Sequence, residues 1–295
     1  MWTGCRKHVE KKGNVERKRK GLRNVGERKI KTERGCPQSD SDVEKRRYGF
    51  SQTVEKKKKV WYNRSMKEEI PDFDECRAQI AQNQDKFTPF YRMLLQYNAA
   101  FNLTAITREE EVFHKHFLDS LAGGRRIPQG ASVAEVGSGA GFPSVPLSIV
   151  RPDLSFTLIE STGKKCQFLK TVAEALGLSI TACQMRAEDA GRDAAFRERF
   201  DCAIARAVAP LPTLAEYCLP LVKKGGSMIA WKGSEDETDA ARNAVRILGG
   251  GNVRAVRYTL PEGYGDRMLV LAEKLRETPA KYPRGQGKER KSPLL

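Results

Sequence analysis

The chain has 295 residues, enough for one large domain or for a domain with appendages. Its net charge of +16 is uneven, because residues 1–70 carry 22 Lys and Arg against 10 Asp and Glu, whereas the remaining residues carry 31 against 27. Seven scattered cysteines and three histidines form no metal-ligand spacing and indicate a reducing compartment. Without a secretory signal or a membrane-length apolar run, the sequence predicts a cytoplasmic protein with no membrane contact and no metal.

Residues 1–68 are basic and poor in aliphatic side chains. We expect this tail to be disordered, because it cannot bury enough apolar surface to offset the entropy of ordering it. Its charge suits an arm that contacts nucleic acid phosphates. We favour the alternative, which is either a solvated tail or a start of translation at Met66, the first internal methionine.

Residues 69–128 are predicted to form a helical extension. Apolar side chains recur at three- and four-residue spacing, which is typical of one face of a helix, at Phe87, Phe90, Tyr91, Leu94 and Leu95. Residues 109–121 repeat the pattern, and two glycines and a proline over 123–128 end it.

Residues 129–273 alternate between short β-rich runs and helical stretches. Strands are predicted at 132–136, 155–159, 180–183, 200–204, 227–231, 253–258 and 267–272, and helices at 143–150, 163–176, 211–223 and 234–248. This alternation predicts an α/β fold with a Rossmann-like, mostly parallel sheet. Only a turn-rich segment separates the last two strands, so we expect an antiparallel strand to close the sheet. Residues 274–295 form a second basic tail.

A glycine-rich loop follows the first predicted strand. Gly137, Gly139 and Gly141 let the backbone adopt positive φ and approach a ligand, and Pro143 suits the first position of the next helix. The dinucleotide pattern G-x-G-x-x-G would require glycine at position 142, where this chain has Phe142. The observed G-x-G-x-G spacing is instead typical of proteins that bind S-adenosylmethionine. A purely structural glycine turn is the alternative.

Carboxylates follow the next two strands. Glu160 ends the second strand, where a carboxylate can accept both ribose hydroxyls of a nucleoside cofactor. Ala187 and Glu188 follow the third strand and can face an adenine ring. For Ala187 and Glu188, an acidic loop that caps a helix is an equally good interpretation.

The end of the fourth strand reads ARAVAP over 205–210. It has no Asp/Asn-Pro-Pro-aromatic motif for methylating exocyclic amines, and the chain has no cysteine after a proline for attack on a pyrimidine. Guanine N7 carries an in-plane lone pair and no proton, so it can attack a sulfonium methyl group without a base if the atoms are aligned. The sequence is compatible with that acceptor and identifies no catalytic residue.

Three further side chains are candidates for binding. Arg206 lies at the mouth of the expected cleft and can contact the cofactor or a substrate phosphate, or form a salt bridge. Lys232 follows the fifth strand and can meet an RNA phosphate or stay solvated. His116 lies on the apolar side of its helix, where a structural histidine is the alternative to a substrate contact.

From about residue 87 to the end, the chain resembles the 16S ribosomal RNA guanine-N7 methyltransferases, historically called glucose-inhibited division protein B. The segments YN (97–98), NLTAI (102–106) and HFLDS (116–120) have no part in a generic cofactor loop and make the match specific. The other matching segments are VGSGAGFP (136–143), PL (146–147), RP (151–152), KK (164–165), FL (168–169), RAE (186–188), RA (206–207), KG (232–233) and YPR (282–284).

The resemblance implies methyl transfer from S-adenosylmethionine to a guanine in 16S ribosomal RNA, either naked or in the small ribosomal subunit. By position it places cofactor contacts on Gly137, Phe142, Ala187, Glu188 and Arg206. It also makes Arg284 a candidate substrate contact, although the following segment GQG (285–287) departs from the Lys-Pro-Gly type of spacing that is usual in the family. The first 70 residues match nothing in the family pattern.

Rival functions remain open at this point. An oxidoreductase that binds NAD could use a similar fold, although position 142 argues against it. A non-catalytic RNA-binding protein could have kept the fold. A methyltransferase that acts on another RNA, on protein or on a small molecule is the third rival.

Overall fold

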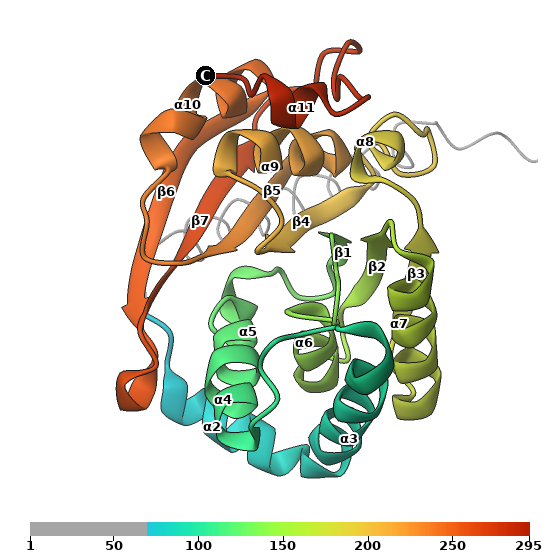
Figure 1. The fold of residues 1–295 in the computed structure, drawn as a ribbon. Coiled ribbons are helices and arrows are strands. Elements are labelled where there is room, and N and C mark those ends of the chain that lie inside the picture. Colours follow the sequence, from blue (N-terminus) through green and yellow to red (C-terminus); the bar gives the residue numbers. More distant parts are fainter. Residues whose placement is uncertain (1–69) are drawn as a thin grey trace, which may run out of the picture. The chain divides into compact units, whose positions relative to one another are not determined.

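The computed structural model describes residues 70–295, so the expectations for residues 1–68 lie outside the described part. Seven strands form one sheet in the order β3-β2-β1-β4-β5-β7-β6 (Figure 1). The strands are β1 (Ser132–Val136), β2 (Ser155–Glu160), β3 (Ile180–Gln184), β4 (Phe200–Arg206), β5 (Val222–Lys232), β6 (Gly250–Thr259) and β7 (Asp266–Lys274).

The predicted parallel sheet and its antiparallel hairpin are confirmed. Strands β1 to β5 pair in parallel, and β7 runs antiparallel to both of its neighbours, β5 and β6. The antiparallel strand is nevertheless not the edge strand, because β7 lies between β5 and β6. Strand β6 therefore closes this side of the sheet.

The predicted boundary between helix 211–223 and the fifth strand is wrong. The helix α9 (Leu211–Cys218) ends early, a 3-10 turn follows over Leu219–Leu221, and β5 begins at Val222. Gly225, at a φ of +81°, lies inside β5, close to where its register with β4 shifts. A glycine pair within a strand often marks a bulge, and the strand predicted at 227–231 begins only after this pair.

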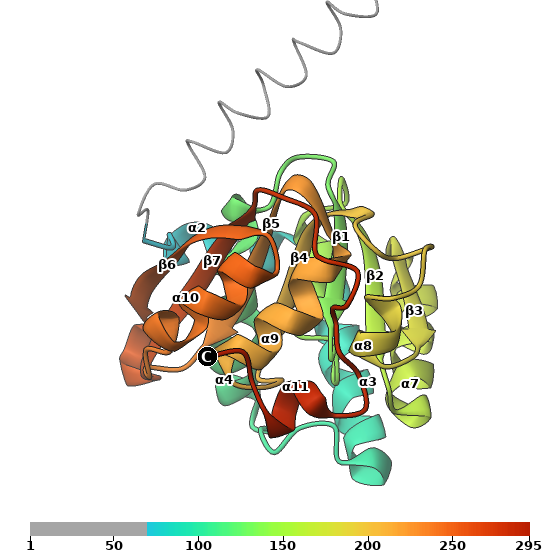
Figure 2. The ribbon, with the colours of Figure 1, turned by 90° about the horizontal axis from the view of Figure 1, so that it is seen from above.

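Helices cover both faces of the sheet (Figure 2). The helical extension comprises α2 (Phe73–Gln82), α3 (Gln84–Phe101), α4 (Glu109–Val112), the π-helix η1 (Phe113–Leu118) and α5 (Asp119–Leu121). It joins α6 (Ser144–Val150) and α7 (Gly163–Leu176) on one face, whereas α8 (Ala187–Ala190), α9 and α10 (Thr238–Ile247) cover the other.

Alternation along the strands divides the core into two layers. Val133 of β1 packs beneath α6 and the helical extension, whereas Ala134 and Val136 pack beneath α9 and α10. Successive strand residues point to opposite faces. Glu135 must therefore lie on the same face as Val133, under α6 and the helical extension.

The helical extension and the glycine-rich loop share one hydrophobic layer. The ring of Phe142, from the loop, lies 5.5 Å from that of Phe90 in α3 and 6.2 Å from that of Phe117 in η1. Phe90 is completely buried. Any movement of the extension would therefore disturb the loop, because close-packed side chains transmit displacement.

The last residues of the chain pack against α8 and α9 (Figure 1). Tyr282 is buried, the Thr213 hydroxyl donates to the carbonyl of Glu289 at 2.8 Å, and α11 (Lys288–Lys291) follows. No helix within residues 70–295 is both long enough and apolar enough to cross a membrane.

Candidate cofactor site

The register of the sheet brings the predicted site residues to one edge. Val136 at the end of β1 pairs with Ile159 of β2 and with Ala205 of β4. The next residues in these strands and loops are Gly137, Glu160 and Arg206, so all three lie at the carboxyl edge of the parallel strands. Ligands of open α/β sheets bind at this edge.

The three glycines of the loop have different physical roles. All have positive φ: +68° at Gly137, +54° at Gly139 and +89° at Gly141. A Cβ atom on Gly137 would lie 2.7 Å from Cγ2 of Val208, and one on Gly141 would lie 2.6 Å from Cγ2 of Val145. Around Gly139 the nearest atom would be the Gly137 carbonyl oxygen at 3.8 Å. The outer glycines therefore permit close packing, whereas the middle glycine borders open space.

Glu160 fixes the position of this loop. Its carboxylate accepts a hydrogen bond from the Gly139 amide at 3.0 Å and another from the Thr162 amide at 2.7 Å. A carboxylate oxygen has further lone pairs after one such bond. Glu160 therefore keeps lone pairs beside the open side of Gly139, and its contact with ribose hydroxyls stays a prediction.

Phe142 and Pro143 form the end of the loop. Phe142 is buried and its ring stacks on His116 with 4.3 Å between centroids. The helix α6 begins at Ser144, with Pro143 as its N-cap, so the prediction that Pro143 is the first helical residue is wrong by one position. The packing of Phe142 reduces the freedom of the loop that it terminates.

The third strand end adds the predicted adenine-side residues. The Met185 amide donates to the carbonyl of Glu160 at 3.1 Å, which holds the start of this segment against β2. Ala187 and Glu188 open the short helix α8, and Glu188 is buried. The two residues therefore lie beside Glu160, and their contact with adenine stays a prediction.

Arg206 is held by several partners at the end of β4. Its Nη2 donates to the carbonyl of Lys115 at 2.8 Å and contacts Nδ1 of His116 at 2.7 Å, and its Nη1 lies 3.1 Å from Oδ2 of Asp119. The guanidinium carbon lies 5.8 Å from the centre of the Phe142 ring. Its side chain is 15% exposed, so only a small part of Arg206 faces the expected cleft.

The two other predicted cations are engaged within the protein. Nζ of Lys232 lies 2.6 Å from Oε1 of Glu237, and Arg284 forms a two-pronged ion pair with the buried Glu216 at 2.8 to 3.2 Å. The first pair joins the end of β5 to the N-cap residue of α10, and the second joins the C-terminal segment to α9. An RNA phosphate would have to compete with these carboxylates.

Glu135 is a further candidate site residue, to which the sequence analysis assigned no role. It is completely buried, and neither carboxylate oxygen has a hydrogen-bond partner of good geometry among residues 70–295. Burial raises the pKa of Glu135 to about 8, while the neighbouring hydroxyls of Ser144 and Ser138 oppose this shift. An acidic residue inside the apolar strand SVAEV was the available signal, because buried carboxylates need a partner.

These residues fit the chemical groups of S-adenosylmethionine. An unpartnered buried carboxylate beneath the loop, Glu135, suits the ammonium group of the amino-acid portion. Glu160 suits the ribose, and the open side of Gly139 leaves room for the ligand.

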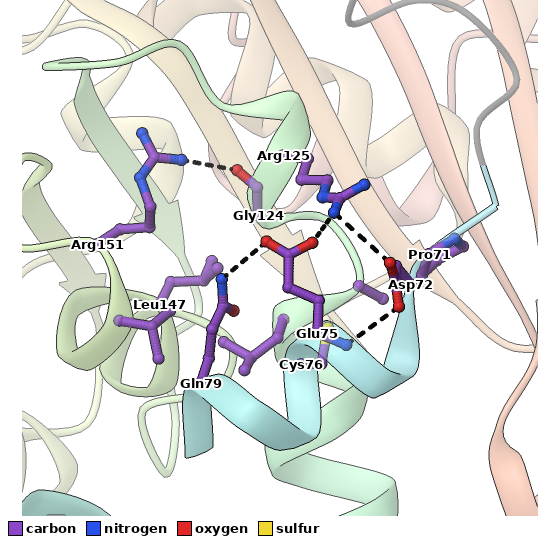
Figure 3. Close-up of a pocket in the computed structure, with 12 residues that line it drawn as sticks. Pro71, Asp72, Glu75, Cys76, Gln79, Gly124, Arg125, Leu147 and Arg151 are labelled. Carbon is purple, nitrogen blue, oxygen red and sulfur yellow. Dashed lines mark hydrogen bonds and ion pairs between the residues drawn. The ribbon is translucent and has the colours of Figure 1, made fainter. Parts of the chain in front are cut away.

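A separate hollow of about 130 Å³ lies between α2 and the end of α6 (Figure 3). Glu75 forms an ion pair with Arg125 at its rim, and Arg151 donates to the Gly124 carbonyl at 2.9 Å. Because α6 ends where β2 is about to begin, this hollow is at the amino edge of the strands. It is therefore remote from the glycine loop and contains none of the predicted site residues.

Fold and site together define the class of protein as an S-adenosylmethionine-dependent methyltransferase. The family model GidB, described as rRNA small subunit methyltransferase G, matches residues 83–258, and the chain belongs to this family. This assignment removes the NAD-dependent oxidoreductase from the alternatives.

Named relatives are similar over most of their length. "Ribosomal RNA small subunit methyltransferase G" of Lactobacillus acidophilus is 44% identical over 218 residues, which cover 72% of this chain and 91% of the relative. The protein of the same name from Staphylococcus aureus (strain Newman) is 43% identical over 227 residues, 75% of this chain and 95% of that one. Among solved structures, Aeropyrum pernix fibrillarin with natively bound S-adenosyl-L-methionine has a TM-score of 0.40 at 16% identity, covering 49% of this chain and 66% of that chain.

The open side of Gly139 makes Gly139→Asp a direct test of the site. We expect the variant to fold, with a cost of about 1–2 kcal/mol for a side chain at positive φ, and to lose measurable binding of S-adenosylhomocysteine by calorimetry. The new carboxylate would occupy the ligand's space and repel Glu160. Gly130→Ala is the matched control, since Gly130 also has positive φ and open surroundings but lies before β1. Unchanged affinity in Gly139→Asp would contradict the assignment.

The buried Glu135 carboxyl predicts a pH-dependent stability. With a folded-state pKa of about 8 against an ordinary 4.5, the folded protein holds this proton where the unfolded chain releases it. The contribution of the protonated Glu135 carboxyl to the free energy of unfolding is therefore lost as the pH rises from 4.5 through 8. Without cofactor, Glu135→Gln should gain stability relative to the parent between pH 5 and pH 9, by on the order of a few kcal/mol in urea unfolding. The exposed Glu174→Gln serves as control, and a pH-independent difference for Glu135→Gln would refute the prediction.

Proposed function

We propose that this protein transfers the methyl group of S-adenosylmethionine to N7 of a guanine in 16S ribosomal RNA, in the cytoplasm. Family membership supports the reaction class and the kind of RNA. The choice of N7 rests on the family to which the chain belongs, and the end of β4 is compatible with it, because the polar side chains described there, Arg206, His116 and Asp119, are engaged with one another.

The side chains around Arg206 illustrate this point. A guanidinium only donates hydrogen bonds. The imidazole of His116 is buried and contacts Arg206 through Nδ1 and the Thr104 hydroxyl through Nε2 at 3.0 Å, so both ring nitrogens are engaged. Burial and the adjacent Arg206 lower the pKa of His116 to about 3, which makes it a poor base.

An acceptor without a proton fits such a site. Bound S-adenosylmethionine would supply an activated methyl group, whose bond to sulfur would break with the electron pair left on sulfur as the N7 lone pair bonds to the methyl carbon. The positive charge would then move to the purine ring, so the protein would not have to move a proton. The protein's contribution is then to align and desolvate the two reactants.

The proposed roles of the chain's own residues follow from their positions. Glu135 would hold the ammonium group of the cofactor, Glu160 its ribose, and Ala187 with Glu188 its adenine. The loop from Gly137 to Phe142 would give the ligand room and a fixed wall. S-adenosylmethionine supplies the methyl group and its leaving group when bound.

Recognition of RNA is proposed to be largely electrostatic. Lys164 and Lys170 project from α7 as exposed side chains and can contact phosphates directly. Lys232, Arg284 and His116 stay candidates for substrate contact, although all three have partners within the protein.

Mass spectrometry of 16S ribosomal RNA tests this function. RNA from cells that lack the gene should lose one N7-methylguanosine, and a plasmid copy should restore it. A copy with Glu160→Ala should not restore it, because the ribose contact and the loop anchor are both removed. Incubating purified protein with naked 16S RNA and with small subunits distinguishes the two substrates. An unchanged content of N7-methylguanosine in the deletion strain would refute the proposal.

A further inference from the structure

Three polar residues of the helical extension, Asn98, Thr104 and His116, contact one another in series. The Asn98 side chain accepts from the Thr104 amide at 2.8 Å, and the Thr104 hydroxyl contacts Nε2 of His116 at 3.0 Å. His116 and Asp119 in turn contact Arg206. A continuous polar chain therefore runs from α3 through the extension to the end of β4.

The backbone at this point is a π-helix, η1, rather than the predicted α-helix. The Asp119 amide donates to the carbonyl of His114, five residues earlier. π-helical turns are rare and occur mostly at functional sites. Here the turn contains both partners of Nη2 of Arg206: the carbonyl of Lys115 and the ring of His116.

The ring of His116 is held through both of its nitrogen atoms. Nη2 of Arg206, which can only donate, lies 2.7 Å from Nδ1, and the carbonyl of Lys115, which can only accept, lies 3.1 Å from the same atom. Nε2 contacts the Thr104 hydroxyl at 3.0 Å. The shorter contact at Nδ1 favours a ring that accepts from Arg206 and carries its proton on Nε2, facing Thr104.

Asp119 is anchored from other elements of the sheet. Its side chain is buried and accepts a hydrogen bond from the Tyr258 hydroxyl of β6 at 2.7 Å. The indole of Trp231 in β5 donates to its carbonyl oxygen at 2.8 Å. The carboxylate that faces Arg206 is thus fixed from β5 and β6 as well as from its own helix.

We propose that His116 and Asp119 are positioning residues that hold Arg206 across the ring of Phe142 and so shape the acceptor side of the cofactor pocket. This inference rests on the proposed function, because it concerns the same site. Arg206 is a long side chain that would otherwise sample many rotamers. His116, Asp119 and the Lys115 carbonyl leave its guanidinium one orientation next to Gly137 and Phe142.

Two substitutions of His116 separate positioning from packing. His116→Asn keeps a side-chain acceptor near the place of Nδ1 but loses the ring that stacks on Phe142. His116→Phe keeps a ring and loses the acceptor. If positioning matters, the His116→Asn variant should keep a higher affinity for S-adenosylhomocysteine and a higher kcat for RNA than the His116→Phe variant, by about threefold or more. If only packing mattered, Phe would be the better replacement, and that order would overturn the proposal.

A double-mutant cycle tests Asp119. Asp119→Asn should lower kcat at saturating cofactor by about tenfold, since it removes the charge that faces Arg206. In an Arg206→Ala background the same change should have an effect of less than about twofold, because its target is gone. Arg206→Met replaces Arg206→Ala if the latter does not fold, and circular dichroism confirms folding at the assay temperature.

Glu262→Gln is the matched control. Glu262 forms an ion pair with Arg77 and contacts Nε2 of His114 at 2.9 Å, and none of its contacts among residues 70–295 is with Arg206. It should leave kcat and cofactor affinity unchanged. An equal effect of Asp119→Asn in both backgrounds, or an equal loss in Glu262→Gln, would overturn the proposal. Failure of the parent protein to bind S-adenosylhomocysteine would instead refute the proposed function itself.

Discussion

The site depends on the hydrogen bond between the Glu160 carboxylate and the Gly139 amide. This bond joins the end of β2 to the middle of a loop that leaves β1, and it keeps the positive-φ conformation of Gly139 open toward the ligand side. Because the two strands are in parallel register, the distance between their ends is fixed by the sheet. The geometry of the loop and the position of the Glu160 carboxylate, which we propose to bind the ribose, are therefore set by the same contact.

Buried charge is the second constraint on this edge of the sheet. Glu135 is buried without a good hydrogen bond, and the Arg206 guanidinium is mostly buried against Asp119. Isolated buried charges are costly, so each needs a counter-charge or a shifted pKa. Asp119 supplies the counter-charge for Arg206. We propose that the cofactor's ammonium group supplies it for Glu135, which would make cofactor binding and the ionisation of this carboxyl one event.

The sequence predicted elements whose signals are local. Helix α7 matches the predicted 163–176, since its apolar spacing is regular and Gly177 at a φ of +60° ends it. The G-x-G-x-G loop and Glu160 were found because a strand–loop–helix unit fixes their relation along the chain. The class of cofactor followed from the same spacing, and the family assignment agrees with it.

Other features depend on contacts between distant residues. The start of β5 was missed because Gly225 and Gly226 resemble a turn until the neighbouring strand β4 is in place. The π-helix η1 is only six residues long, so the apolar pattern predicts an α-helix there, and the hydrogen bond from the Asp119 amide to the His114 carbonyl is what distinguishes the two. The internal partners of Lys232 and Arg284 are Glu237 and Glu216, which no local pattern connects to them.

A crystal structure with S-adenosylhomocysteine tests the central claim most directly. The account predicts ligand at the carboxyl edge, with its ribose hydroxyls on Glu160, its backbone contact at Gly139 and its ammonium group on Glu135. Ligand bound elsewhere, or a Glu135 carboxyl that stays without a partner while the pocket is filled, would contradict it.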